Sequence, residues 1–123
     1  MRMAADPILA NDGALTVALH VSTVNAVYCL LWTLPPGASA WQDEREVANG
    51  DGLPTHVQYD VVGDTSIGWR LAVGGLANST YGVALNLLQS NTEIVNGHIT
   101  LTGTLDASGQ DTRTGSVHLQ SAP

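Results

Sequence analysis

The sequence predicts an all-β protein, folded as an antiparallel β-sandwich of about seven to eight strands. Apolar residues recur at every second position in several short segments, which is the spacing of a strand with one buried face. Turn-forming Gly, Asn, Asp and Ser separate these segments at intervals of roughly 8 to 12 residues. No long stretch carries apolar residues at the helical period of about 3.6 residues.

Size and composition predict a single folded domain over residues 1–123. A chain of 123 residues can bury one hydrophobic core without help from disulfides or metals. Hydrophobic residues make up 44% of the chain and charged residues 12%, a composition that excludes a disordered protein.

Two strands are predicted in the first third of the chain. Residues 15–22 (LTVALHVS) alternate between large apolar and smaller or polar side chains, which predicts a half-buried strand. Residues 26–34 (AVYCLLWTL) are apolar on both faces, which predicts a central strand covered on both sides and ended by Pro35-Pro36-Gly37. Residues 38–56 have no clean period and are predicted as a long loop with room for one short edge strand.

The remaining strands follow the same alternation. Residues 56–62 (HVQYDVV) form the next predicted strand, before a GDTS turn. Residues 67–73 and 81–87 alternate on either side of the loop GGLANST, which reverses the chain. Residues 98–105 (HITLTGTL) and 116–120 (SVHLQ) are predicted as the last strands, joined by the turn DASGQDTRTG.

One part of this pattern resembles a known family. The residues that carry the resemblance are Trp69, Leu71, Val73, Gly75-Leu76, Tyr81, Val83 and Leu85. In this order they resemble the middle of bacterial immunoglobulin-like and fibronectin-type-III-like domains. The resemblance implies a scaffold for adhesion, recognition or spacing, with Tyr81 as a tyrosine-corner residue whose hydroxyl bonds to backbone a few residues upstream. The sequence departs from the family by lacking a cysteine pair and by having Asn78 where a loop proline is usual.

The charge balance argues against nucleic acid and membrane surfaces as partners. Eleven acidic residues stand against four basic ones, and the formal net charge is −7. A phosphate backbone or an anionic membrane would therefore be repelled overall. The longest apolar run, residues 26–34, is shorter than the ~20 residues of a membrane helix, and the N-terminus has no secretion signal. As written, the chain is expected in the cytoplasm, with export by another route or prior processing left open.

Motifs for catalysis and cofactor binding are absent from the sequence. It contains no P-loop, dinucleotide-binding, zinc-protease or nucleophile-elbow pattern. No nucleophile, base and orienting group can be named together, so we expect a protein that is not an enzyme and needs no cofactor. Cys29 lies in an apolar run and is expected to be a buried hydrophobic residue.

Metal binding is not predicted either. His20, His56, His98 and His118 each fall at an outward strand position and are expected to be solvated. His98 and His118 could approach one another only if their strands pair. The acidic segment 41–52 (WQDEREVANGDG) could hold calcium, but a solvated acidic loop explains it better.

The tryptophans divide into two groups. Trp32 and Trp69 fall in register with apolar strand residues, so we expect both in the core. Trp41 lies in the irregular segment beside polar residues, where it could stack against a sugar ring or an apolar partner group. The alternative is that Trp41 folds back and covers one end of the core.

Two functions remain open from the sequence. The first is a non-catalytic recognition module that binds a carbohydrate or a protein through loops at one end of the sandwich. Its candidate binding residues are Trp41, Gln42, Asp43, Glu46, Asn49 and Asp51. The second is a structural or assembly subunit that forms a homo-oligomer through sheet edges or faces.

Overall fold

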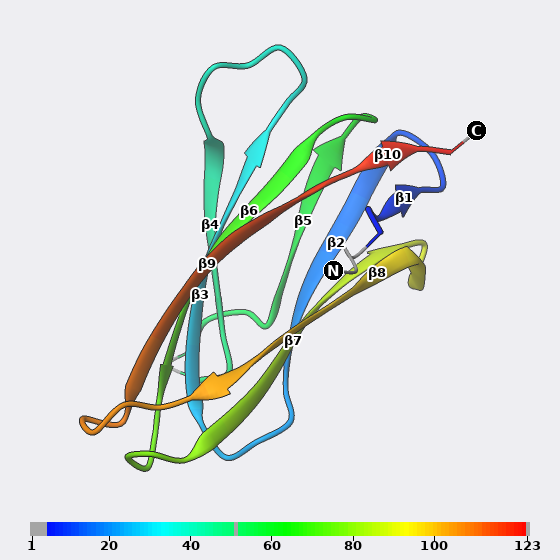
Figure 1. Ribbon diagram of the computed structural model, residues 1–123. Helices are drawn as coiled ribbons and strands as arrows, with labels where there is room; N and C mark the ends of the chain where they lie inside the picture. The colour runs from blue at the N-terminus through cyan, green and yellow to red at the C-terminus, as the bar shows by residue number, and fades with distance from the viewer. Residues whose placement is uncertain (1–4, 51, 123) are drawn as a thin grey trace.

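The structure is a computed structural model that describes residues 5–50 and 52–122. It consists mainly of β-strands. Within these residues the chain forms ten β-strands and no α-helix (Figure 1). The all-β prediction is therefore confirmed, with two short additional strands near the chain ends. The described residues include no helix with the length and hydropathy needed to cross a membrane.

The strands form two sheets that pack face to face. The larger sheet has the order β10 (Gln120–Ser121), β1 (Ile8–Leu9), β8 (Thr92–Thr104), β7 (Thr80–Gln89), β2 (Gly13–Val21) and β5 (His56–Val61). The smaller sheet has the order β4 (Gln42–Ala48), β3 (Ala26–Leu34), β6 (Ser66–Gly74) and β9 (Gln110–His118). Neighbouring strands are antiparallel, except that β1 and β10 run parallel.

The core lies between the sheets and follows the two-residue period of the strands. On β3, Val27, Cys29 and Leu31 are buried, while the residues between them are only partly buried. On β7, Tyr81, Val83 and Leu85 point into the same core from the opposite sheet. Cys29 is fully buried, as the sequence predicted.

The outward face of β3 corrects two predictions. Residues 26–34 were predicted to be covered on both sides, but only the face toward the larger sheet is covered. Trp32 was predicted in the core, yet it lies on the uncovered face and is partly exposed. The outer side of the strand therefore carries aromatic and aliphatic groups at the protein surface, and an apolar residue type alone did not indicate burial.

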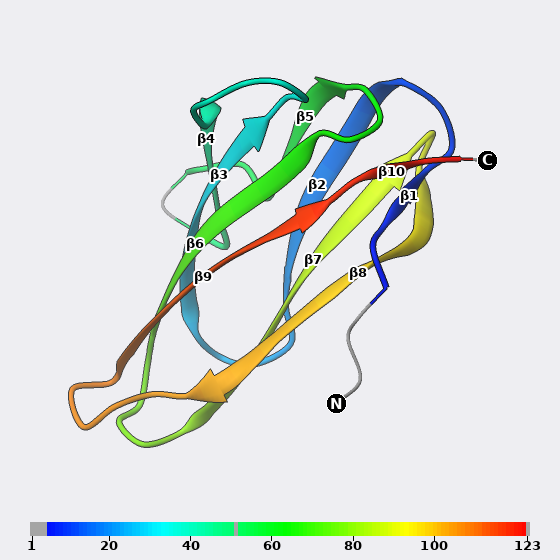
Figure 2. The same ribbon diagram turned by 45° about the horizontal axis from the view of Figure 1, so that its top comes forward.

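The loop around residues 74–80 joins the two sheets. It leads from β6 in the smaller sheet to β7 in the larger sheet, and the turn after β8 leads back to β9 (Figure 2). The β2–β3, β6–β7 and β8–β9 connections gather at one end of the molecule, opposite the β3–β4 connection (Figure 1). The last connection is shorter than predicted, because β9 already begins at Gln110 within the predicted turn.

Strand β4 occupies much of the segment that was predicted as a long loop. It is an edge strand of the smaller sheet and pairs with β3 through an irregular register near Leu31 and Thr33. Only Val47 and Ala48 are buried. The residues before them are mostly charged, so the sequence shows no alternation of apolar residues that would indicate a strand. Asp43 adopts a positive φ of 54°, which fits the irregular start of the strand.

Candidate binding face

The predicted binding residues do not form one loop cluster. Trp41 precedes β4, Gln42, Asp43 and Glu46 lie on the strand, and Asn49 follows its end. Asp51 lies outside the described residues. A strand of this length separates Trp41 from Asn49 by roughly 25 Å. The prediction that these residues meet in loops at one end of the sandwich is therefore wrong, because the segment is extended along a sheet edge.

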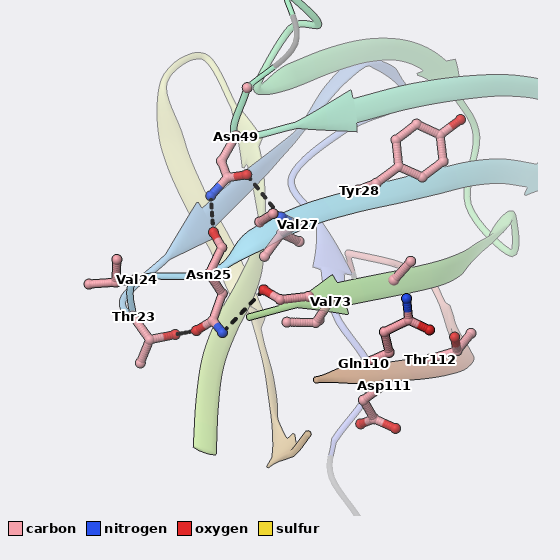
Figure 3. A pocket seen from close by; sticks show the side chains of 14 residues that line it. Thr23, Val24, Asn25, Val27, Tyr28, Asn49, Val73, Gln110, Asp111 and Thr112 are labelled. Carbon is pink, nitrogen blue, oxygen red and sulfur yellow. Dashed lines mark hydrogen bonds between the residues drawn. The ribbon is translucent and has the colours of Figure 1, made fainter. Parts of the chain in front are cut away.

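The side chain of Asn49, just after the end of β4, is bonded to the start of the neighbouring strand β3. Its Oδ1 accepts a hydrogen bond from the backbone N–H of Val27 at 2.9 Å, and its Nδ2 donates to the carbonyl of Asn25 at 2.6 Å (Figure 3). Both polar ends of the amide are thus engaged with backbone. The side chain fixes the β2–β3 connection.

Asp43 connects β4 to β5 in the other sheet. Its carboxylate pairs with the guanidinium of Arg45 at 3.0 Å, and its carbonyl accepts a hydrogen bond from the Tyr59 hydroxyl at 3.0 Å. The Arg45 guanidinium also lies 5.4 Å from the centre of the Tyr59 ring, within cation–π range. These contacts give Asp43 a structural role.

The face of the smaller sheet that points away from the core carries a different set of side chains. We call it the outer face, and its members on β3, β6 and β9 are Tyr28, Leu30, Trp32, Gly68, Arg70, Ala72, Thr112, Thr114 and Ser116. Strand pairing places them in three rows across the sheet, which are Tyr28–Ala72–Thr112, Leu30–Arg70–Thr114 and Trp32–Gly68–Ser116. Aromatic side chains therefore stand in the two outer rows and a cation in the middle row.

Trp41 packs on this face, over Gly68. A Cβ built on Gly68 would stand 3.0 Å from two carbons of the Trp41 ring, so a larger residue here would push the ring away from the strand. The rest of the side chain reaches solvent, because 45% of the residue is exposed. Trp41 thus folds back as the sequence alternative foresaw, but onto the sheet surface instead of the end of the core.

Trp32 stands in the same hollow as Trp41. Its Nε1 donates a hydrogen bond of 3.1 Å to a carboxylate oxygen of Glu44 on β4, which fixes the orientation of the indole. The hollow has a volume of about 420 Å³ and is closed on the far side by Arg70, Thr114 and Ser116. Three indoles, those of Trp32, Trp41 and the mostly buried Trp69, and the hydroxyl groups of Thr114 and Ser116 therefore line one cavity.

Tyr28 lines the continuation of this hollow along the sheet. A second hollow of about 230 Å³ lies between Tyr28, Arg70 and Ala72, so Arg70 borders both. Tyr28 and Ala72 also line a third hollow of about 780 Å³, which extends to the β2–β3 turn (Figure 3). Shared lining residues make the hollows one groove along the outer face, and we call it the outer groove.

The charges at the outer groove are separated by strand. Glu44 and Glu46 lie on β4, and Arg70 lies on β6, with β3 between them. Desolvation, and then the charge of Glu46, raises the pKa of the Tyr28 phenol. The hydroxyl can donate a hydrogen bond.

Trp69 lies in the core, as predicted, and its indole N–H has a distinctive position. Nε1 is buried and has no hydrogen-bond partner among the described residues. It lies beneath Gly115, whose added Cβ would stand 3.2 Å from this nitrogen. Gly115 in turn lines the hollow that contains Trp32 and Trp41.

Among the described residues, no histidine lines the three hollows, and His98 and His118 lie apart from one another. His98 Nδ1 lies 2.7 Å from Asn86 Oδ1, and His118 Nε2 lies 3.0 Å from Asp64 Oδ1. Their strands, β8 and β9, belong to different sheets and do not pair. Within residues 5–50 and 52–122, no group of three or more His, Cys, Asp or Glu could hold a metal ion.

Sequence reasoning identified Trp41 and Glu46 but missed Tyr28, Trp32 and Arg70. The sequence does contain a sign of this face, because Tyr28 and Trp32 lie on the same side of a strand whose other side carries only aliphatic or small residues. The sequence could not decide which side of the strand faces solvent, since both sides are apolar. Arg70 shows which side of β6 is exposed. The pairing of β6 with β3 would then show which side of β3 is exposed, because Arg70 pairs with Leu30.

No protein-family model, curated protein or solved structure matches this chain. The function is therefore inferred from the side chains of the outer groove.

Proposed function

We propose that the protein is a non-catalytic recognition module of immunoglobulin-like type that binds carbohydrate in the outer groove. The observation that carries the proposal is the position of Trp41, whose ring packs against Gly68 while 45% of the residue stays exposed to solvent. An aromatic ring that packs on a strand and stays largely exposed is suited to stacking against a flat ligand. The groove replaces the end loops as the proposed site.

The other side chains of the groove fit a sugar chain. Sugar rings combine an apolar face with many hydroxyl groups, so they need aromatic surface and hydrogen-bonding groups in the same place. Trp32 and Tyr28 supply further aromatic surface along the groove. Glu46, Arg70 and Thr114 supply acceptors and donors at its middle. A groove open along the strands favours an elongated chain of sugar rings over a single ring.

The test is a binding screen against an array of oligosaccharides, followed by calorimetric titration of the bound ones. The wild-type protein is expected to bind at least one class, and Trp41→Ala to bind it at least tenfold more weakly. This substitution removes a surface side chain, so far-UV circular dichroism should be unchanged. Absence of binding across the array, or binding that is indifferent to Trp41→Ala, would overturn the proposal.

A pair of glycine variants provides the matched control. Gly68→Ala places a methyl group 3.0 Å from the Trp41 ring and should displace it, whereas at Gly74 on the same strand the nearest atom is 3.8 Å away. We expect Gly68→Ala to weaken glycan binding and to shift the tryptophan fluorescence. Gly74→Ala, at a residue that lines the third hollow away from Trp41, should leave the tryptophan fluorescence as in wild type and controls that measurement. Equal behaviour of the two variants would show that the seat of the Trp41 ring has no role in binding.

A second candidate function, assembly into a homo-oligomer, is favoured by strand β9. It is an edge of the smaller sheet, and most of its residues are exposed. An exposed edge of this length can pair with a second chain. Light scattering coupled to size-exclusion chromatography over a range of concentrations tests this function. A concentration-independent oligomer would support assembly, and a monomer throughout would exclude it as a property of the chain alone.

The predictions about location and other partners belong to the same proposal. We expect a protein that resides in the cytoplasm and that binds neither nucleic acid nor membranes. The net charge of −7 supports the last two expectations. Vesicle and nucleic-acid binding assays at low salt would test them.

A further inference from the structure

Arg70 occupies the centre of the outer groove. On β6 its outward neighbours are Gly68, which the Trp41 ring covers, and Ala72, whose small side chain leaves that side of Arg70 open. The same arginine lines the hollow of Trp41 and the hollow of Tyr28. A ligand that runs along the groove must pass the guanidinium.

The charge of Arg70 is not neutralised inside the protein. Arg45 pairs with Asp43, and Arg113 donates a hydrogen bond to the carbonyl of Thr102. Arg70 forms no ion pair and no side-chain hydrogen bond within residues 5–50 and 52–122. Across the sheet its neighbours are Leu30 and Thr114, which are uncharged. The guanidinium in the middle of the groove therefore presents five N–H donors without partners among the described residues and a permanent positive charge.

We propose that the ligand is an acidic oligosaccharide whose anionic group binds Arg70, an inference that rests on the proposed carbohydrate function. A carboxylate or a sulfate on the sugar can accept two parallel hydrogen bonds from the guanidinium fork. The sugar rings on either side of the acidic one then stack near Trp41 and Tyr28. The hydroxyl of Thr114, beside Arg70 on β9, offers a further donor.

The rest of the protein limits how many charges the ligand carries. The net charge is −7, and Glu44 and Glu46 border the groove on β4. A densely charged polymer would be repelled by these groups, whereas one anionic group flanked by neutral sugars would meet only Arg70. The groove is thus specific for a sparsely charged chain.

The experiment compares oligosaccharides in matched pairs. Glucuronoxylan oligosaccharides, with one uronic acid among neutral sugars, are titrated before and after chemical reduction of the carboxyl group. The wild-type protein is expected to bind the acidic member at least tenfold more tightly than its reduced form. Sulfated oligosaccharides form a separate arm that decides between carboxylate and sulfate. Polygalacturonate, a densely charged chain, should bind weakly.

Arginine variants assign the preference to one residue. Arg70→Gln should abolish the difference between acidic and reduced members while it keeps the binding of the neutral form. Arg70→Lys should retain part of the preference, because the charge remains and the fork is lost. Arg113→Gln changes the net charge equally but lies away from the groove, and it should keep the full preference.

The outcomes separate this inference from the proposed function. Equal binding of acidic and reduced forms, or a preference that survives Arg70→Gln, would overturn the role of Arg70 and leave carbohydrate binding intact. If no oligosaccharide of either kind binds the wild-type protein, the carbohydrate function itself fails and this inference fails with it.

Discussion

The hydroxyl of Tyr81 donates a hydrogen bond of 2.5 Å to Oδ2 of Asp111, and this contact joins β7 in the larger sheet to β9 at the edge of the smaller one. The ring of Tyr81 is buried, and it leaves no room for a side chain at Gly103 on β8, where an added Cβ would stand 2.6 Å from the hydroxyl oxygen. Burial, and then the bond to Asp111, raises the pKa of Tyr81. The resemblance to immunoglobulin-like domains implied a backbone partner upstream, and that expectation was wrong.

Tyr81→Phe should lower the free energy of unfolding by about 1–2 kcal/mol, because it removes one hydrogen bond to a charged group and leaves the ring in place. Urea denaturation followed by tryptophan fluorescence measures the change. Thr112→Ala, an exposed change on the same strand, serves as the control and should stay within about 0.5 kcal/mol of wild type. A midpoint unchanged by Tyr81→Phe would show that the contact does not hold the sheets together.

Cys29 should make the protein sensitive to alkaline pH. Burial raises the pKa of its thiol to about 12, whereas an unfolded cysteine titrates near pH 8.5. Above about pH 8.5 the unfolded chain loses this proton and the folded chain keeps it, so stability is complete below that pH and falls as the pH rises toward 12. The slope is at most about 1.4 kcal/mol per pH unit.

Cys29→Ala tests this slope. Urea denaturation under reducing conditions between about pH 8.5 and 9.5, where unfolded tyrosines are still mostly protonated, should show a steeper loss of stability for wild type than for the variant. Parallel pH profiles would contradict the prediction, whatever the offset between them.

Gln89 should be essential for attaching the segment before β2. It is buried, its Oε1 accepts a hydrogen bond from the N–H of Ala10 at 2.8 Å, and its Nε2 donates to the carbonyls of Asn11 and Ala14 at 2.9 and 3.3 Å. Gln89→Leu leaves these backbone groups without partners and should lower the unfolding free energy by about 2–4 kcal/mol. Gln110→Leu, at an exposed position, should cost far less. Similar losses for both glutamines would refute the attachment role.

Asn49 should matter for stability, in contrast to the exposed residue Gln42 at the start of β4. Asn49→Ala removes two hydrogen bonds to backbone and should cost about 1–2 kcal/mol in unfolding free energy. Gln42→Ala should change it by less than about 0.5 kcal/mol. Thermal unfolding of the two variants side by side is the measurement, and equal melting temperatures would contradict the structural role of Asn49.

The strands that were predicted best have one polar and one apolar face. Residues 15–22 and 81–87 alternate in this way, and both lie almost entirely within observed strands. Burial selects such a pattern directly, so it can be recovered from the sequence. Strand β4 could not be recovered, because an edge strand needs little apolar surface and its charged residues resemble those of a loop.

The candidate site was only partly predictable, for a related reason. Trp41 stood out because it lies among polar residues. Tyr28 and Trp32 did not, since an exposed apolar face of a strand carries the same types of residue as a buried one. Only the pairing of strands shows that these rings share a face with Arg70, and pairing depends on contacts far apart in the chain.

The short strands at the two ends of the chain have a consequence for folding kinetics. Ile8 on β1 pairs with Gln120 on β10, so the larger sheet gains its last strand only when nearly the whole chain is present. The pairing of β6 with β9 spans two intervening strands in the same manner. Contacts this distant in sequence give a high contact order, and proteins of this kind fold in roughly milliseconds to seconds. A ribosome-bound chain that lacks residue 120 would therefore wait, incompletely closed, for its C-terminal strand to emerge.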